Sequence, residues 1–71
     1  MTTDILKSFG KSLRAYRVNR GLSQEELAEL AHLDRTYISG VERGTRNISL
    51  KAIYSLATAL EMSVSQLLAE I

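Results

Sequence analysis

Apolar residues in this chain recur at intervals of three and four, the spacing that places side chains on one face of an α-helix. The first series consists of Leu6, Phe9, Leu13 and Tyr16, and a later one of Leu50, Ile53, Leu56 and Leu60. We expect both series to face one core, together with Leu27, Ile38 and Val41. Strict alternation of apolar and polar residues is scarce and Pro is absent, which argues against strands. The pattern therefore predicts an all-α fold.

Capping residues divide the chain into five short helices, which we expect over residues 4–20, 24–31, 35–43, 50–60 and 64–69. Ser23 and Glu26 have the S-x-x-E spacing of a capping box, in which each side chain satisfies a free backbone N–H group. The later N-caps are Asp34, Ser49 and Ser63. Gly21 and Gly44 follow helices as residues that tolerate a positive φ.

The composition is that of an ordinary globular protein, with 45% hydrophobic and 24% charged residues. Cys is absent and His32 is the one histidine, so disulfides and thiolate metal sites are excluded. The four glycines match no phosphate-binding motif. We therefore expect one domain over residues 1–71, with no catalytic residue, no metal and no cofactor.

The net charge of +1 hides a segregation of charge along the chain. Residues 1–20 hold five basic residues and one acidic residue, whereas residues 21–34 hold four acidic residues and no basic one. No apolar run approaches the ~20 residues of a membrane span. The N-terminus also lacks the pattern of a signal peptide. We expect a cytoplasmic protein of bacterial or phage origin that has no membrane partner.

The second and third expected helices are short, and three residues separate them, which is the spacing of a helix-turn-helix over about residues 23–43. Ala28 is small where the two helices would cross, and Leu33 can fill the turn. Ile38 and Val41 stand where the third helix must face the core. Any corner between two packed helices needs similar residues, so the spacing alone leaves both interpretations open.

Polar residues on the outer face of the third helix favour DNA binding. They are Arg35, Thr36, Tyr37 and Ser39, all near the helix N-terminus, which in a helix-turn-helix contacts base edges in the major groove. Arg can bond O6 and N7 of guanine. The alternative is a solvated face with Asp34 and Arg35 serving the cap. Gly40, in mid-helix, predicts a close approach by another helix or by a DNA backbone.

The stretch GLSQEELAELAHLDRTYISGVERGTRNISL resembles the Cro/C1-type helix-turn-helix family of phage repressors. Within it, LDRTYISGVERGTRNISL is similar to the controller proteins of restriction–modification systems. The resemblance covers about residues 9–68. It implies a compact five-helix, lambda-repressor-like fold and a dimeric regulator of transcription that binds double-stranded DNA and has no small-molecule ligand. It also implies an activator at one occupancy of a pseudo-palindromic operator and a repressor at a higher one.

The resemblance also implies roles for single residues. Gln24 matches a glutamine that binds a phosphate and braces the recognition helix, and Arg35, Thr36, Tyr37 and Ser39 match recognition positions. Arg43, Arg46 and Asn47 match family positions, around the loop that follows the third helix, that contact DNA or its backbone. Glu25 and Glu29 match acids with which activating members contact RNA polymerase, although acids near a helix N-terminus also stabilise the helix. His32 departs from the family, which usually has Gly at this turn, and its role is left open.

Among Lys7, Lys11, Arg14 and Arg17, the strongest candidate for a phosphate contact is Arg17, because it lies closest to the second helix. The alternative for these basic residues of the first helix is a solvated face.

Apolar residues near the C-terminus exceed what a small core can cover, which indicates a homodimer. The expected dimer surface is formed by Ile48, Val64, Leu67 and Leu68. The alternative is a last helix that simply covers the monomer core. Other functions also remain open, namely an antitoxin or another protein-interaction module, and a prophage repressor.

Overall fold

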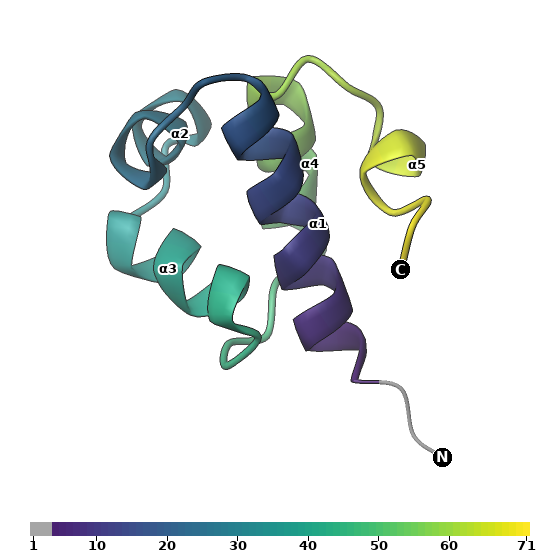
Figure 1. Ribbon diagram of the computed structural model, residues 1–71. Coiled ribbons are helices and arrows are strands. Elements are labelled where there is room, and N and C mark those ends of the chain that lie inside the picture. Colours follow the sequence, from purple (N-terminus) through teal and green to yellow (C-terminus); the bar gives the residue numbers. More distant parts are fainter. Residues whose placement is uncertain (1–3) are drawn as a thin grey trace.

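The computed structural model describes residues 4–71, and over that range it contains helices and no strand (Figure 1). The helices are α1 (Ile5–Asn19), α2 (Gln24–Ala31), α3 (Arg35–Arg43), α4 (Leu50–Ala59) and α5 (Val64–Leu67). The expectation of an all-α, five-helix fold is confirmed. No helix within residues 4–71 combines the length and the hydropathy that crossing a bilayer requires.

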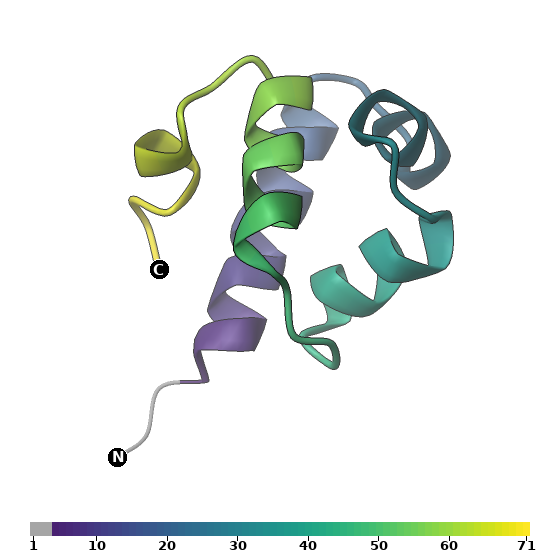
Figure 2. The same cartoon turned by 180° about the vertical axis from the view of Figure 1, so that it is seen from behind.

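The helices α2 and α3 lie together on one side of α1 and α4, and α5 lies on the opposite side (Figures 1 and 2). The α3 helix contacts both α1 and α2, and α2 also contacts α4. This arrangement leaves the outer face of α3 open, with the α2–α3 turn at one end and the α3–α4 loop at the other.

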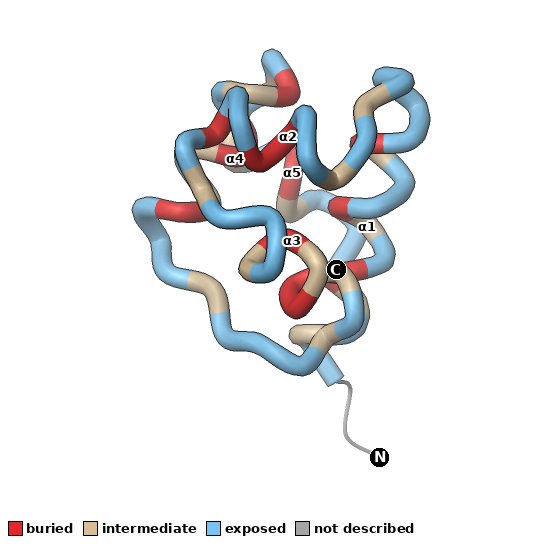
Figure 3. The backbone as a smooth tube through the Cα atoms, turned by 90° about the vertical axis from the view of Figure 1, so that its left-hand side faces the viewer, coloured by how far each residue is buried: buried red, intermediate tan, exposed pale blue. Residues whose placement is uncertain are grey.

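Each of the five helices contains buried positions (Figure 3), and apolar residues at these positions form the core. The largest fully buried ones are Leu13, Leu27, Ile38, Val41, Leu56, Leu60 and Leu67. Burying each side chain of this kind stabilises the fold by about 1.5–3 kcal/mol. Leu50, expected in the core, is instead 75% exposed, because it occupies the first position of α4 and lies outside the cluster.

Local capping explains where the helices begin. Ser23 and Glu26 form both hydrogen bonds of the expected capping box. Ser63 and Gln66 form a second capping box at the start of α5. The α5 helix is shorter than expected, because residues 68–70 form turns rather than a continuing helix.

Gly10 marks the close crossing of α1 and α3. A Cβ atom added there would lie 2.5 Å from the carbonyl oxygen of Val41 and 2.6 Å from that of Glu42. At Gly40, for which a close approach was expected, the atoms nearest to an added Cβ belong to the side chains of Arg46 and Thr45, the nearest at 3.4 Å. Of the two approaches expected at Gly40, the one by another helix is therefore wrong, and the one by a DNA backbone stays a prediction. The position that needs glycine for packing lies on α1.

Candidate nucleic-acid interface

The turn between α2 and α3 is short and internally bonded. His32 ends α2 in the left-handed conformation, with φ 59° and ψ 41°. The backbone N–H of Leu33 donates to the carbonyl of Ala28 at 2.9 Å, and the Leu33 side chain packs against the core. Asp34 then caps α3. The turn thus fixes the direction in which α3 leaves α2.

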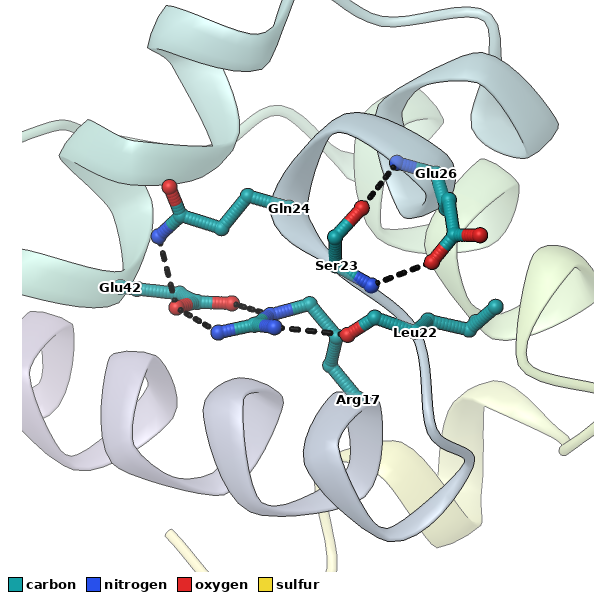
Figure 4. A network of polar contacts seen from close by, with 6 residues as sticks. All are labelled: Arg17, Leu22, Ser23, Gln24, Glu26 and Glu42. Atoms are coloured by element: carbon teal, nitrogen blue, oxygen red, sulfur yellow. Dashed lines mark hydrogen bonds and ion pairs between the residues drawn. The ribbon is translucent and has the colours of Figure 1, made fainter.

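A buried ion pair joins α1 to α3 (Figure 4). Arg17 donates from Nε to Oε2 of Glu42 at 2.6 Å and from Nη2 to Oε1 at 3.0 Å. Its Nη1 donates to the carbonyl of Leu22 at 2.7 Å, so the same guanidinium also holds the turn between α1 and α2. The hydrogen bonds to Glu42 and the charge of its carboxylate raise the pKa of Arg17, although burial opposes them.

The structure corrects the role expected for Arg17. The residue is 8% exposed, and three of its N–H groups are directed at Glu42 and Leu22. Its guanidinium is therefore committed within the protein, and Arg17 does not belong to the DNA-backbone set. The sequence could not show this, because its partner lies 25 residues away.

Gln24 joins the same network from the start of α2. Its Nε2 donates to Oε1 of Glu42 at 3.0 Å (Figure 4). The side chain therefore braces α3 against α2, and it is only half-buried. A side-chain amide has two N–H donors, so one of them is left for a further acceptor such as a phosphate.

The outer face of α3 holds the four residues expected to read bases. Arg35 and Thr36 are exposed, whereas Tyr37 and Ser39 are half-buried. Thr36 donates both its backbone N–H and its hydroxyl to Asp34. Arg43 donates from Nη1 to the hydroxyl of Ser39 at 2.6 Å.

Tyr37 also holds the α3–α4 loop. Its hydroxyl lies 3.5 Å from the carbonyl oxygen of Asn47 and accepts from the N–H of Ser49 at 3.4 Å. The Arg46 guanidinium carbon lies 5.1 Å from the centre of the Tyr37 ring, within range of a cation–π interaction. Sequence reasoning missed this role of Tyr37, because no local pattern links a helix residue to a loop ten positions later.

Three cations, Arg35, Arg43 and Arg46, lie exposed on α3 and the following loop. The ion pairs formed within residues 4–71 are Arg17–Glu42 and Arg20–Glu61, so none of these three cations is neutralised by one. Asn47 is exposed beside Arg46. The face therefore combines positive charge with hydrogen-bonding groups, as nucleic-acid recognition requires.

Acidic residues lie on the neighbouring helix. Glu25 and Glu29 are exposed on α2 and enter no ion pair within the described residues, whereas Glu26 serves the capping box. Glu25 and Glu29 therefore offer negative charge to a partner.

The residues expected at a dimer surface differ in burial. Ile48, Val64 and Leu68 are half-buried against the core. Leu67 is fully buried within one subunit, because α5 packs it into the core, so its placement at the dimer surface is wrong. Leu50 and Tyr54 are exposed apolar side chains that line a shallow groove together with Val64.

Within residues 4–71, no three His, Asp or Glu side chains gather in a way that could hold a metal ion.

Comparison with known proteins places this geometry among DNA-binding regulators. The Helix-turn-helix family model matches residues 13–67. The chain is 48% identical over 65 residues to control protein C.SmaI of Serratia marcescens, which covers 92% of this chain and 77% of that protein. It is 45% identical over 69 residues to control protein C.BamHI of Bacillus amyloliquefaciens, which covers 96% of this chain and 85% of that protein.

A solved structure shows the same likeness. The restriction–modification controller protein C.AhdI from Aeromonas hydrophila superposes with a TM-score of 0.86 at 55% sequence identity. The match covers 87% of this chain and 94% of that one.

Proposed function

Since this chain belongs to the helix-turn-helix family of DNA-binding transcriptional regulators, we propose that it is a restriction–modification controller protein. It binds a pseudo-palindromic operator as a homodimer. The observation that carries this proposal is the exposed face of α3, on which Arg35, Arg43 and Arg46 lie and take part in neither of the two ion pairs found among residues 4–71.

Residues on this face divide into those that read bases and those that hold the DNA backbone. Arg35 donates to O6 and N7 of a guanine, and Thr36, Tyr37 and Ser39 make the further contacts in the major groove. The backbone contacts come from Gln24, Arg43, Arg46 and Asn47. The buried pair of Arg17 and Glu42 supports these residues by fixing α3 relative to α1.

Regulation follows from occupancy of the operator. Bound at one site, the protein activates transcription, with Glu25 and Glu29 of α2 presented to RNA polymerase. Bound at a second site, it represses. Replacing both acids by Gln removes activation and leaves DNA affinity intact if this assignment is right. Loss of both activation and DNA binding would instead show that Glu25 and Glu29 are needed for the protein to fold.

Dimerisation sets the spacing of the two recognition helices. In a two-fold symmetric dimer, the two α3 helices enter successive major grooves ~34 Å apart, and the operator mirrors that symmetry. The exposed groove formed by Leu50, Tyr54 and Val64 is the surface that we assign to the partner subunit.

Selection of bound duplexes from a random-sequence pool at near-physiological salt tests the proposal. We expect enrichment of a pseudo-palindrome with half-sites ~10 bp apart. Arg35→Ala relaxes the preference at one base pair at a cost of roughly 1–3 kcal/mol, whereas Arg43→Ala weakens binding to all sequences. If no sequence is enriched and modest salt abolishes binding, the protein makes only nonspecific phosphate contacts. That outcome would reject the proposal that it is a sequence-specific regulator.

The exposed apolar groove also supports a second candidate, a protein-interaction module such as an antitoxin. In that case Leu50 and Tyr54 bind a different protein rather than a second copy of this chain. A stable homodimer that covers both residues would reject this alternative.

A further inference from the structure

The N-terminal turn of α3 contains a closed pair of polar side chains, Asp34 and Thr36. One carboxylate oxygen of Asp34, Oδ1, accepts from the backbone N–H of Thr36 at 2.7 Å and from its hydroxyl at 2.7 Å. Both residues are exposed, and Thr36 belongs to the residues assigned to the major groove. A base that approaches Thr36 therefore meets a hydroxyl that is already bonded to Asp34.

The direction of the hydroxyl bond in this pair is fixed by chemistry. The bonds from Thr36 lower the pKa of Asp34, so its carboxylate is ionised and carries no proton to give. Thr36 must then be the donor, and a hydroxyl has a single proton. The Thr36 oxygen keeps only lone pairs for a further partner, and the free oxygen of Asp34 is likewise an acceptor.

Ser39, one turn further along α3, has the opposite character. Its hydroxyl oxygen accepts from Nη1 of Arg43 at 2.6 Å, and its own proton stays available. Two hydroxyls on one helix face thus differ in what they can bind. Ser39 can donate to a phosphate or to a base acceptor, whereas Thr36 can only accept as long as its hydroxyl stays bonded to Asp34.

The major groove offers donors at few places. They are the exocyclic amino groups, N4 of cytosine and N6 of adenine, whereas guanine O6 and N7, thymine O4 and the phosphates are acceptors. We propose that Thr36, oriented by Asp34, reads one such amino group, beside the guanine read by Arg35. This inference rests on the proposed function and assigns the class of group that Thr36 recognises.

Such a contact determines the orientation of one base pair. Every base pair presents one amino group in the major groove, and the strand that carries it depends on the sequence. An acceptor-only Thr36 therefore favours the orientation that brings the amino group to it. It also disfavours guanine O6 or N7 at that point, because two acceptors would face each other.

Deleting single amino groups from the DNA tests the contact. The duplex is the operator selected by the wild-type protein, in which purine replaces adenine, or pyrimidin-2-one replaces cytosine, at one position at a time. We expect one deletion within each half-site to weaken wild-type binding about fivefold, the effect of one hydrogen bond. Thr36→Val, which keeps the shape and the backbone bond to Asp34, binds this duplex and the intact operator equally.

Two variants serve as matched controls. Thr36→Ser keeps the hydroxyl and the Asp34 bond, so it responds to the deletion as the wild type does. Ser39→Ala removes the other hydroxyl and leaves the response unchanged. If every deletion weakens wild type and Thr36→Val by the same factor, Thr36 does not read an amino group. Absence of any preferred operator for the wild type would instead reject the proposed function.

Discussion

The guanidinium of Arg17 and the carboxylate of Glu42 form a two-point ion pair between α1 and α3, with N–O distances of 2.6 and 3.0 Å. The two side chains are 10% and 4% exposed. Gln24 donates to the same carboxylate from α2, so one acid holds three helices. Because α3 carries the proposed base-reading residues, this pair sets the position of the DNA-binding face.

Glu42→Gln tests the energetic weight of that pair. The new amide NH2 would face the Arg17 donors and leave a buried cation unpaired, so we expect a loss of about 3 kcal/mol in the free energy of unfolding. Glu61→Gln is the matched control, since Glu61 pairs with Arg20 but is 76% exposed, and we expect less than about 1 kcal/mol there. Urea unfolding followed by circular dichroism measures both. Equal losses in the two variants would show that burial does not govern this pair.

Two glycines in helices provide a second contrast. Gly10→Ala places a methyl group against the backbone carbonyls of Val41 and Glu42, which cannot move without shifting α3, so we expect a loss of about 1–3 kcal/mol. Gly40→Ala meets Arg46 and Thr45 at ordinary contact distances and removes a flexible residue from a helix. We expect it to gain up to about 1 kcal/mol.

Thermal unfolding of the two alanine variants decides between these outcomes. A melting temperature that rises for Gly40→Ala and falls for Gly10→Ala supports the assigned crossing of α1 and α3. A fall for Gly40→Ala would mean that its surroundings are tighter than the structure shows.

Helix positions could be predicted from the sequence because their signals are local. Ser23, Asp34, Ser49 and Ser63 each accept a hydrogen bond from a backbone N–H two or three residues ahead, so a short window of sequence contains both partners. The same holds for the polar cluster at the start of α3.

Long-range pairings could not be read in this way. In the sequence, Arg17 looks like any exposed basic residue of an amphipathic helix, because only folding brings Glu42 beside it. Leu67 and Leu50 are equally apolar in sequence, yet one is fully buried and the other is 75% exposed. The difference depends on how α4 and α5 pack, which no local pattern specifies.

His32 adopts a conformation that favours glycine, with φ 59°. A left-handed backbone costs a residue with a side chain roughly 1–2 kcal/mol. His32→Gly relieves that strain but enlarges the freedom of the unfolded chain, so we expect a net gain of about 0.5–1 kcal/mol. His32→Ala separates the two effects, because it removes the imidazole and keeps the strain. Urea unfolding that shows the same gain for both variants would assign the effect to the imidazole.

The lowered pKa of Asp34 predicts a pH dependence of stability. A carboxylate whose pKa is depressed on folding stabilises the protein above its unfolded pKa, near the ordinary value of 3.8, and loses that contribution as the pH falls through the folded pKa. Asp34→Asn keeps a good N-cap without the charge. We expect the urea midpoints of wild type and variant to differ by a constant amount near neutral pH and to converge below the ordinary value. A difference that does not change with pH would show that the charge of Asp34 has no part in stability.

Leu50 and Tyr54 are exposed apolar side chains that share a groove with Val64, one of the residues expected at the dimer surface. Leu50→Glu places a charge there in both copies of a symmetric dimer, and each copy also loses about 1.5–3 kcal/mol of apolar burial. We expect the dimer to dissociate at least 100-fold more readily, measured by sedimentation equilibrium over a range of concentrations. Val18→Glu is the control, because Val18 is 56% exposed on α1, away from this groove, and should leave the dimer intact. A wild-type protein that stays monomeric at every concentration would contradict the homodimer. The groove would then favour binding of a different protein.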